Sequence, residues 1–449
     1  MNGEPGKLRE GGVLTGTDSR LAEMLRRAVN VREEEVRALL WSFAYFFCLL
    51  CGYYILRPLR DEMGIAGGVR NLQWLFTGTF AVMLLAVPLF GALVARFPRR
   101  RIVPLLYRFF ILNILIFFLL LKFGDGQVYV ARIFFIWVSV FNLFVVSVFW
   151  SFMADFFGNE QGKRLFGFIA AGGTAGAVLG PAITTFLAVP FGPVNLLLVS
   201  ALLLEGAVQC IYQLLRSPGV NKGGRKEEPA REEAIGGGIL EGALRVFQSP
   251  YLLGICLYIF LYTTTATFLY FQQAHIIKGA FDSSAERTQV FALMDLLTNT
   301  LTILTQCFLT GRLMTRFGVA SALAFLPVVV ALAFSGLAAA PVLPIIIAAQ
   351  VFRRASNFAI SRPGREVLFT VVSRKEKYKS KNFIDTVVYR GGDAVSGWMY
   401  ALMSAAGLGF SFIAVLSVPI ALGWAAVGVL LGKKQERLSK GSVGYFFFS

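Results

Sequence analysis

The sequence predicts an all-α membrane protein with twelve transmembrane helices in two six-helix parallel repeats. Three observations lead to this prediction: the composition, the uncharged runs and an internal repeat. Of the 449 residues, 56% are hydrophobic and only 15% are charged, and the mean hydropathy is +0.66. A soluble domain carries about 25% charged residues. Most of the surface is therefore expected to face lipid.

Uncharged runs define the individual spans. A helix needs about 20 apolar residues to cross the hydrocarbon core, and residues 38–56 and 71–95 form two such runs. The run 165–204 has room for two helices, separated at "VPFGP" (189–193), where proline and glycine interrupt a helix. The expected spans are about 38–58, 71–95, 102–121, 127–154, 165–188, 193–215, 248–271, 288–310, 318–339, 342–370, 382–405 and 409–431.

These spans divide the chain into five parts. The segment before the first span is charged and lacks an apolar region, so no cleavable signal peptide is expected. The residues 216–245 are rich in Gly and charge and predict a solvated linker. The expected parts are a cytoplasmic segment 1–35, a six-helix bundle 36–215, the cytoplasmic linker 216–245, a second six-helix bundle 246–432 and a cytoplasmic tail 433–449.

The positive charges predict the orientation. Of the 43 Lys and Arg, 31 fall in segments on one face, 7 on the other and 5 inside spans. Cytoplasmic loops carry the excess of Lys and Arg, so a multi-pass protein of the cell (inner) membrane with both termini in the cytoplasm is expected. Topology thus explains the net charge of +17 better than its rival interpretation, nucleic-acid binding.

An internal repeat supports two equivalent halves. "GALVARF" (91–97) recurs as "GRLMTRF" (311–317), and "GGTAG" (172–176) recurs as "GGDAV" (391–395), at offsets of about 220 residues. This plan, with a Gly/Arg loop after spans 2 and 8, resembles the major facilitator superfamily. The resemblance implies a substrate site near the midplane between the halves and alternating access.

Glycines in the fifth span predict a close helix contact. Gly172, Gly176 and Gly180 recur every four residues, a stripe that lets two helices approach closely. A phosphate-binding loop is the alternative, but no "GK[ST]" follows and the segment is apolar. Helix packing is therefore the preferred interpretation.

Two arginines are expected deep in the membrane. Arg353 and Arg354 lie about 17 Å into span 10, at 1.5 Å per residue, where a charge is costly. One alternative is a structural ion pair; Asp295, Glu205 and Asp155 are the available acids. The other is an anion site, with one arginine facing an acid and the other facing the cavity.

Further charged residues are candidates for the same two roles, anion binding and ion pairing. Substrate-binding candidates, besides Arg353 and Arg354, are Arg57, Arg60, Arg132 and Arg390. Arginine binds phosphate and carboxylate through forked hydrogen bonds. The excess of buried arginine over buried acid therefore favours an anionic substrate. Pro58 is a candidate break in the first span, and an interfacial anchor outside the bilayer is the alternative role of Arg57 and Arg60. The candidates for ion pairing or gating are Asp61, Asp155, Arg362, Arg365, Glu366, Lys381, Asp385 and Asp393.

Three motifs carry a more specific resemblance. "YYILRPLRDEMG" (53–64), "FWSFMADFFGNEQGKRLFGFIAAGGTAGAVLG" (149–180) and "SRPGREVLFTVVSRKEKYKSKNFIDTVVYRGGDAVSG" (361–397) resemble the nucleotide (ATP/ADP) translocases of bacteria and plastids. The resemblance covers about residues 33–432. It implies exchange of ATP against ADP without hydrolysis, and it implies that Arg60 and Asp61, a basic residue followed by an acid, matter for substrate.

Other classes of function receive less support. A proton-coupled exporter of drugs or metabolites is the main alternative, with Glu205 and Asp295 as candidate proton carriers. The only histidine is His275, so metal and His-based catalysis are not expected, and the protein is predicted not to be an enzyme. We expect no cofactor, no metal, no nucleic-acid partner and a monomer whose partners are membrane lipid and a small anionic substrate.

Overall fold

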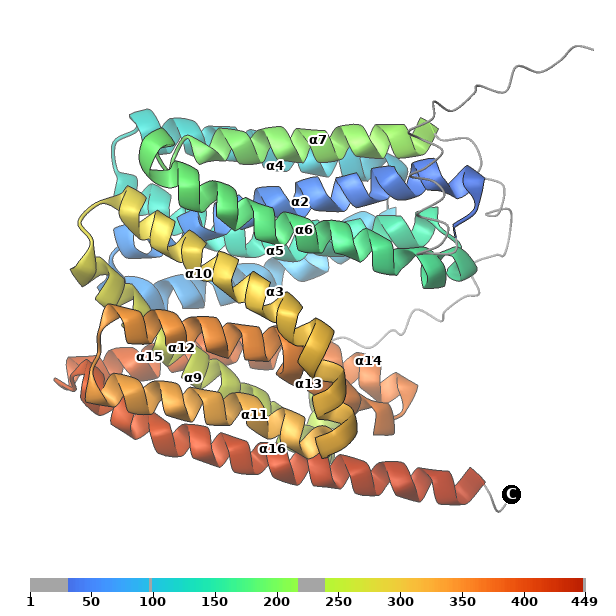
Figure 1. Cartoon of the computed structure of the whole chain (residues 1–449), viewed down its shortest axis with the longest axis vertical. Helices are drawn as coiled ribbons and strands as arrows, with labels where there is room; N and C mark the ends of the chain where they lie inside the picture. Colours follow the sequence, from blue (N-terminus) through green and yellow to red (C-terminus); the bar gives the residue numbers. More distant parts are fainter. Residues whose placement is uncertain (1–30, 97–98, 217–238, 447–449) are drawn as a thin grey trace, which may run out of the picture.

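The computed structural model describes residues 31–96, 99–216 and 239–446 as two helical bundles (Figure 1). Of the expected parts, residues 1–30, 217–238 and 447–449 lie outside the described residues. The first bundle contains α2 (Glu33–Ala66), the short η1 (Val69–Asn71), α3 (Leu72–Arg96), α4 (Arg99–Phe123), α5 (Gln127–Phe156), α6 (Asn159–Phe191) and α7 (Leu196–Arg216).

The second bundle follows the same plan with more interruptions. It contains α9 (Pro250–Ala280), α10 (Ser284–Thr305), η3 (Gln306–Thr310), α11 (Gly311–Ala339), α12 (Leu343–Ser356), η4 (Asn357–Ser361), α13 (Arg362–Leu368), η5 (Phe369–Val371), η6 (Ile384–Val388), α15 (Tyr389–Ala405) and α16 (Phe410–Phe446). Two short helices, α8 (Ile239–Gln248) and α14 (Arg374–Phe383), pack against each other outside the spans.

The described residues account for twelve spans. Within residues 31–96, 99–216 and 239–446, nine helices are long and apolar enough to cross a membrane by themselves. One of them covers 284–339 and turns at Gly318, where φ is +75°, a value that favours glycine, so it supplies two spans. The interrupted helices α12–η4–α13 and η6–α15 complete the set, and the predicted all-α, twelve-helix fold is confirmed.

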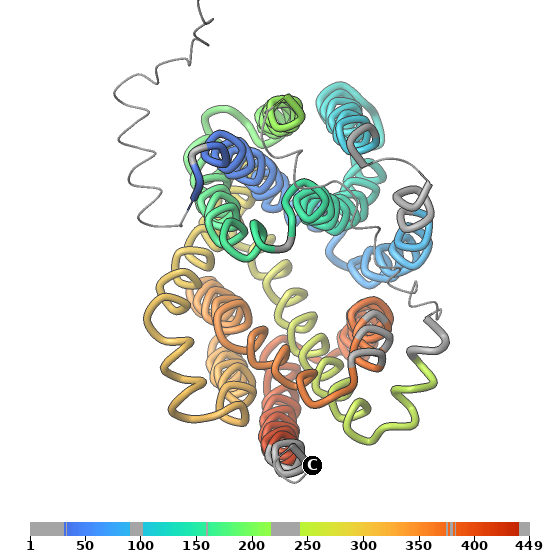
Figure 2. The backbone as a smooth tube through the Cα atoms, turned by 90° about the vertical axis from the view of Figure 1, so that its right-hand side faces the viewer, coloured from blue at the N-terminus to red at the C-terminus, as the bar shows by residue number. Residues whose placement is uncertain are grey.

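Each bundle has its own hydrophobic core. The core of the first is rich in aromatic side chains, with Tyr45, Tyr107 and Phe149 fully buried, and that of the second includes Tyr258 and Trp424. Figure 2 shows the two bundles side by side, with α2–α7 above and α9–α16 below. They meet along two seams, where α10 packs on α2 and α6 and where α15 packs on α3.

The bundle has two ends, which are named here for the description of the site. The terminus end is the end at which α2 begins and α16 finishes, and the far end is the opposite one (Figure 1). Helix α2 runs from the terminus end to the far end without interruption. The break considered at Pro58 is wrong, because α2 continues through this residue to Ala66. Proline costs one backbone hydrogen bond, which membrane helices tolerate when neighbouring groups compensate.

The glycine stripe of α6 lies directly against the backbone of α2. A Cβ added to Gly176 would stand 2.5 Å from the Phe47 carbonyl oxygen, and one added to Gly180 would stand 2.6 Å from that of Cys51. One added to Gly172 would meet the carbonyl oxygen of Phe43 in the same way. These separations leave no room for a side chain, so the glycines set the distance between α6 and α2.

Span 10 differs from the uninterrupted helix that was expected. It consists of α12, the π-helical turn η4 and α13, and π-helical turns also occur at η3 and η6. Two of these turns contact each other: Thr310 donates a hydrogen bond to the carbonyl oxygen of Ala359 at 2.9 Å, and Gln306 donates to that of Phe358 at 3.3 Å. Side chains thus satisfy carbonyl groups that the widened turns expose. Such turns are frequent at functional sites.

Candidate functional site

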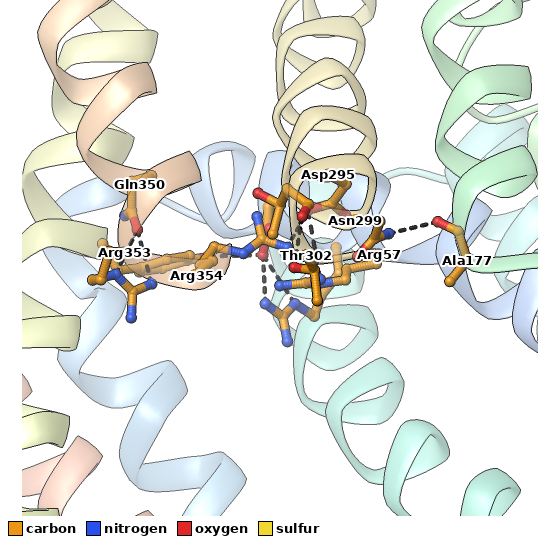
Figure 3. Close-up of polar contacts among 12 residues, drawn as sticks. Arg57, Ala177, Asp295, Asn299, Thr302, Gln350, Arg353 and Arg354 are labelled. Carbon is orange, nitrogen blue, oxygen red and sulfur yellow. Dashed lines mark hydrogen bonds and ion pairs between the residues drawn. The ribbon is translucent and has the colours of Figure 1, made fainter. Parts of the chain in front are cut away.

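Two arginines from different bundles share one buried carboxylate. Arg57 of α2 lies 3.5 Å from Asp295 of α10, and Arg354 of α12 lies 2.5 Å from the same oxygen. Figure 3 shows both guanidinium groups reaching the carboxylate from opposite sides. Asp295 is 1% exposed. A buried carboxylate needs a cation beside it, and here two cations compete for one acid.

Arg353 points away from this acid. Its Nε and Nη2 donate hydrogen bonds of 3.0 and 2.8 Å to the side-chain oxygen of Gln350, one turn earlier in α12 (Figure 3). Adjacent helical residues diverge because the helix has 3.6 residues per turn. Arg354 is therefore the acid-paired member of the couple, and Arg353 is buried with an amide as its hydrogen-bond partner.

The next turn of α2 carries a second arginine with its own acid. Arg60 lies 2.6 Å from Asp61, and the hydroxyl of Tyr270 from α9 donates to the same oxygen of Asp61 at 3.2 Å. This turn therefore brings Arg60 and Asp61 to the boundary between the bundles.

Helix α15 completes the group. Arg390 and Asp393 form an ion pair of 3.7 Å within that helix, and Thr267 of α9 donates to Asp393 at 3.5 Å. We call the whole set the arginine cluster; its members are Arg57, Arg60, Arg353, Arg354 and Arg390 with Asp61, Asp295 and Asp393.

A cavity of about 320 Å³ adjoins the cluster on the side of the terminus end. It lies between the two bundles and is connected to the cluster by Tyr54, whose ring lies 5.8 Å below the guanidinium of Arg57. Its lining residues come from α2, α6, α10, η3, η4 and α13, and they are Phe46, Leu50, Tyr54, Ala170, Gly173, Thr174, Ala177, Asn299, Thr302, Ile303, Gln306, Phe358 and Arg362.

The far end is tied together across the bundles. Arg287 of α10 binds Glu62 of α2 through two hydrogen bonds of 2.8 and 2.7 Å. Gln289 donates to the carbonyl oxygen of Thr185 at 2.9 Å, and the indole of Trp398 donates to Thr77 at 3.1 Å. These contacts lie beyond the cluster, whereas the cavity lies on its other side.

Several predicted site residues lie outside the cluster. Arg132 donates to the carbonyl oxygen of Gly67 at 2.8 Å, near the far end. Lys381 of α14 and Glu366 of α13 form an ion pair of 2.7 Å within the second bundle. Arg362 lines the cavity. Asp155, Arg365 and Asp385 lie in α5, α13 and η6, towards the terminus end.

Sequence reasoning missed the residues that act between bundles. The carboxylate of Glu62 in α2 binds Arg287 of α10, 225 residues further along the chain. Asn299 and Gln306 were not considered, although they continue the face of α10 that begins at Asp295. Their spacing is helical and visible in the sequence, but only the packing of α10 against α2 and α6 shows which face matters.

The fold and the site define a class. Two six-helix bundles with a charged group and a cavity between them are the architecture of a membrane transporter. The chain belongs to the Major Facilitator Superfamily, whose family model matches residues 41–380. A comparison with curated proteins finds no match.

Solved structures agree on the fold. The nucleoside transporter NupG is 13% identical, with 91% of this chain and 100% of that chain covered and a TM-score of 0.56. The POT family transporter PepTSo is 14% identical, with 89% and 98% covered and a TM-score of 0.62. A bacterial homologue of the iron transporter ferroportin in an inward-facing state is 13% identical, with 88% and 99% covered and a TM-score of 0.62. The chain is a secondary transporter, not an enzyme.

Proposed function

We propose that this transporter moves an anionic substrate, of the nucleotide class or another phosphorylated metabolite, by alternating access. The observation that carries the proposal is the composition of the arginine cluster. The cluster contains five arginines but only three aspartates, and its ion pair between Arg57 and Asp295 spans the boundary between the bundles. Two positive charges therefore remain without an acid inside the cluster, at the place where a transported molecule would bind.

The free-energy cost of placing these arginines inside the membrane is an argument for a bound anionic ligand. Insertion scales assign about 2.5 to 3.5 kcal/mol to an arginine at the centre of a membrane helix. A structural ion pair would need one acid for each arginine, whereas Arg57 and Arg354 share Asp295. A polyanion between them would supply the missing negative charge. Guanidinium groups bind phosphate oxygens through forked hydrogen bonds, so phosphate is the best-matched anion.

The proposal assigns a role to each residue of the cluster. Arg353, Arg354, Arg57 and Arg60 bind the anion in this proposal. Asp61 and Asp393 orient and neutralise their arginine neighbours while the site is empty. Arg390 supports the site through Asp393, and Arg132, which contacts the Gly67 carbonyl, has a structural role.

The charge distribution supports an orientation. With both termini in the cytoplasm, the far end is extracellular and its cross-bundle contacts close the external side. The cavity then lies on the cytoplasmic side, next to Arg362. Two bundles, 36–215 and 246–432, rock against each other around the cluster in a monomer of the inner membrane. The ion pair between Glu366 and Lys381 and the nearby Arg362, Arg365, Asp155 and Asp385 are the candidates for the cytoplasmic gate.

The resemblance to nucleotide translocases supports the nucleotide as the specific substrate. NupG is a nucleoside transporter by its description, but PepTSo and the ferroportin homologue have similar TM-scores. The solved structures therefore do not decide the substrate: the arginine cluster supports an anion, and the resemblance to nucleotide translocases supports a nucleotide. Proton-coupled export has less support, because Glu205 lies beside Arg108 within the first bundle and Asp295 is already paired with two arginines.

Counter-exchange in proteoliposomes tests the proposal. Vesicles loaded with unlabelled ATP receive labelled ADP outside, for the wild type, Arg353→Ala/Arg354→Ala and the control Arg108→Ala. Arg108 is half-exposed and lies outside the cluster. Uptake that requires internal nucleotide, persists in the control and disappears in the double variant is expected. Absence of uptake by correctly inserted wild-type protein would rule out nucleotide exchange.

A further inference from the structure

We infer that the cavity beside the arginine cluster is a subsite for the uncharged head group of the substrate, and that it selects head groups rich in hydrogen-bond donors. The inference rests on the proposed function, because the anionic end of the same molecule would occupy the cluster. Its residues are Asn299 and Thr302 of α10 and Gln306 of η3, with Thr174 of α6 on the opposite wall.

Both lining amide side chains use their NH₂ group on a backbone carbonyl. The amide of Asn299 contacts the carbonyl oxygen of Ala177 at 2.5 Å (Figure 3). The amide of Gln306 contacts the carbonyl oxygen of Phe358 at 3.3 Å. A carbonyl can only accept a hydrogen bond, so in each case the NH₂ group must face it. The amide oxygens of these two lining residues remain as acceptors.

The threonine hydroxyls are used in the same way. Thr302 donates its proton to the carbonyl oxygen of Thr298 at 2.7 Å, and Thr174 donates to that of Ala170 at 3.2 Å. A hydroxyl has one proton and two acceptor positions. Once the proton is committed to the helix, only acceptor positions point to a ligand. Four lining side chains therefore offer acceptors, which match the N–H and O–H groups of a ligand. Arg362 of α13, at the α13 side of the same cavity, offers only donors, which match a ring nitrogen or a sugar oxygen of the same head group.

The positions of the polar residues along α10 indicate the direction in which a ligand lies. Asp295, Asn299, Thr302 and Gln306 are separated by four, three and four residues, which places them along one face of the helix. Asp295 marks the arginine cluster, and Thr302 lies seven residues further, about 10 Å along the axis. An elongated ligand can therefore place its anionic end at Arg57 and Arg354 and its head group beside Thr302.

Aromatic walls indicate the shape of the head group. Phe46 and Tyr54 of α2 and Phe358 of η4 line the same cavity. A flat ring can stack on such aromatic faces whatever its substituents. A volume of about 320 Å³ lies at the small end of the ~300–1,000 Å³ of ligand pockets. The ligand class that fits is a phosphorylated compound with a flat amino-substituted ring or a hydroxyl-bearing sugar, such as an aminopurine nucleotide.

Calorimetry on the purified full-length protein tests the inference with two probes, ADP and inorganic pyrophosphate. Pyrophosphate has the anionic end without a head group. We expect wild-type protein to bind ADP more tightly than pyrophosphate. In the double variant Thr302→Val/Gln306→Met, the Kd for ADP should rise about tenfold, because one to two hydrogen bonds to the head group are lost. The Kd for pyrophosphate should stay the same.

Two further variants separate the head-group role from a folding defect. Thr302→Ser keeps the hydroxyl and should bind ADP as the wild type does. Thr315→Val removes an exposed hydroxyl that donates to Gly311 in the same manner, outside the cavity, and should change neither Kd. Equal binding of the two probes by the wild type, or an unchanged Kd for ADP in the double variant, would overturn the subsite but not the anion site. If neither probe binds, the proposed function fails and the subsite fails with it.

Discussion

Glu62 and Arg287 form a two-point ion pair that joins the bundles at the far end. The carboxylate of Glu62 is fully buried, and Arg287 holds both of its oxygens at 2.8 and 2.7 Å. The remaining Nη1 of Arg287 donates to the carbonyl oxygens of Phe281 and Asp282, each at 2.9 Å. The guanidinium is thus fixed in its own bundle while it binds the other, so opening the far end must separate this pair.

Glu62→Gln should shift the protein towards a state that is open at the far end. Breaking one partner of a buried pair costs about 3 to 5 kcal/mol, and here the cost falls only on the closed state. Spin labels are attached to cysteines introduced at Val128 and Lys278, both exposed near the far end, in a protein whose native cysteines have been replaced. Electron paramagnetic resonance should then report a longer distance between the two labels. Glu160→Gln removes an exposed pair with Lys163 and serves as the control. An unchanged distance distribution in Glu62→Gln would show that the pair does not hold this end closed.

Asp295 and Arg354 should be strongly non-additive in a double-mutant cycle. Asp295→Asn leaves two buried arginines without their shared acid, and Arg354→Gln removes one of those charges again. We expect the double variant to be more stable than Asp295→Asn, with a coupling energy of about 1 to 3 kcal/mol. Thermal unfolding in detergent measures each variant. Additive losses would mean that the two side chains do not interact in the folded protein.

Gly176→Ala should destabilise the protein although alanine favours helices. The substitution usually stabilises a helix by about 1 kcal/mol. Here the new methyl group would lie 2.5 Å from the carbonyl oxygen of Phe47 and 2.8 Å from the nitrogen of Cys51, so overpacking of about 1 to 3 kcal/mol should dominate. Gly167 of the same helix has nothing within 4 Å of an added Cβ, and Gly167→Ala is the matched control. A melting temperature that rises equally in both variants would contradict close packing of α6 on α2.

Lys381→Ala should change the stability by at most about 1 kcal/mol. Its ion pair with Glu366 is short, at 2.7 Å, but the two side chains are 34% and 47% exposed. Water and salt screen such pairs, and exposed pairs contribute about 0 to 1 kcal/mol. Unfolding measured at low and high salt should differ less in the variant than in the wild type. A loss of several kcal/mol would show that the pair is part of a larger buried network.

The sequence predicted most of the fold because lipid imposes a simple rule. Uncharged runs of about 20 residues located the twelve spans, and the repeated "GALVARF" and "GRLMTRF" located the two halves. The glycine stripe was also understood correctly from spacing alone. Pro58 was misjudged because a local preference of proline gives way to packing of α2 against α6, α7 and α10.

The site was predicted in part. Arg353 and Arg354 were recognised because a charge in an apolar span is conspicuous, and Asp295 was among the acids considered for them. The sequence did not predict which of the two arginines pairs with Asp295, because this depends on whether Arg353 or Arg354 faces α10. Glu62 and Arg287 are 225 residues apart, and Asn299 is uncharged. Their roles depend on contacts between bundles, which the sequence pattern of one helix does not encode.

The composition of the arginine cluster has an electrical consequence. Its five arginines and three aspartates leave two positive charges among groups that belong to both bundles. A dianion bound there makes the cluster neutral, whereas a tri- or tetra-anion makes it negative. Each elementary charge that moves across the membrane gains or loses about 2.3 kcal/mol per 100 mV. Under the proposed function, two substrates that differ by one phosphate respond differently to the membrane voltage, so the membrane potential sets the preferred direction of their transport.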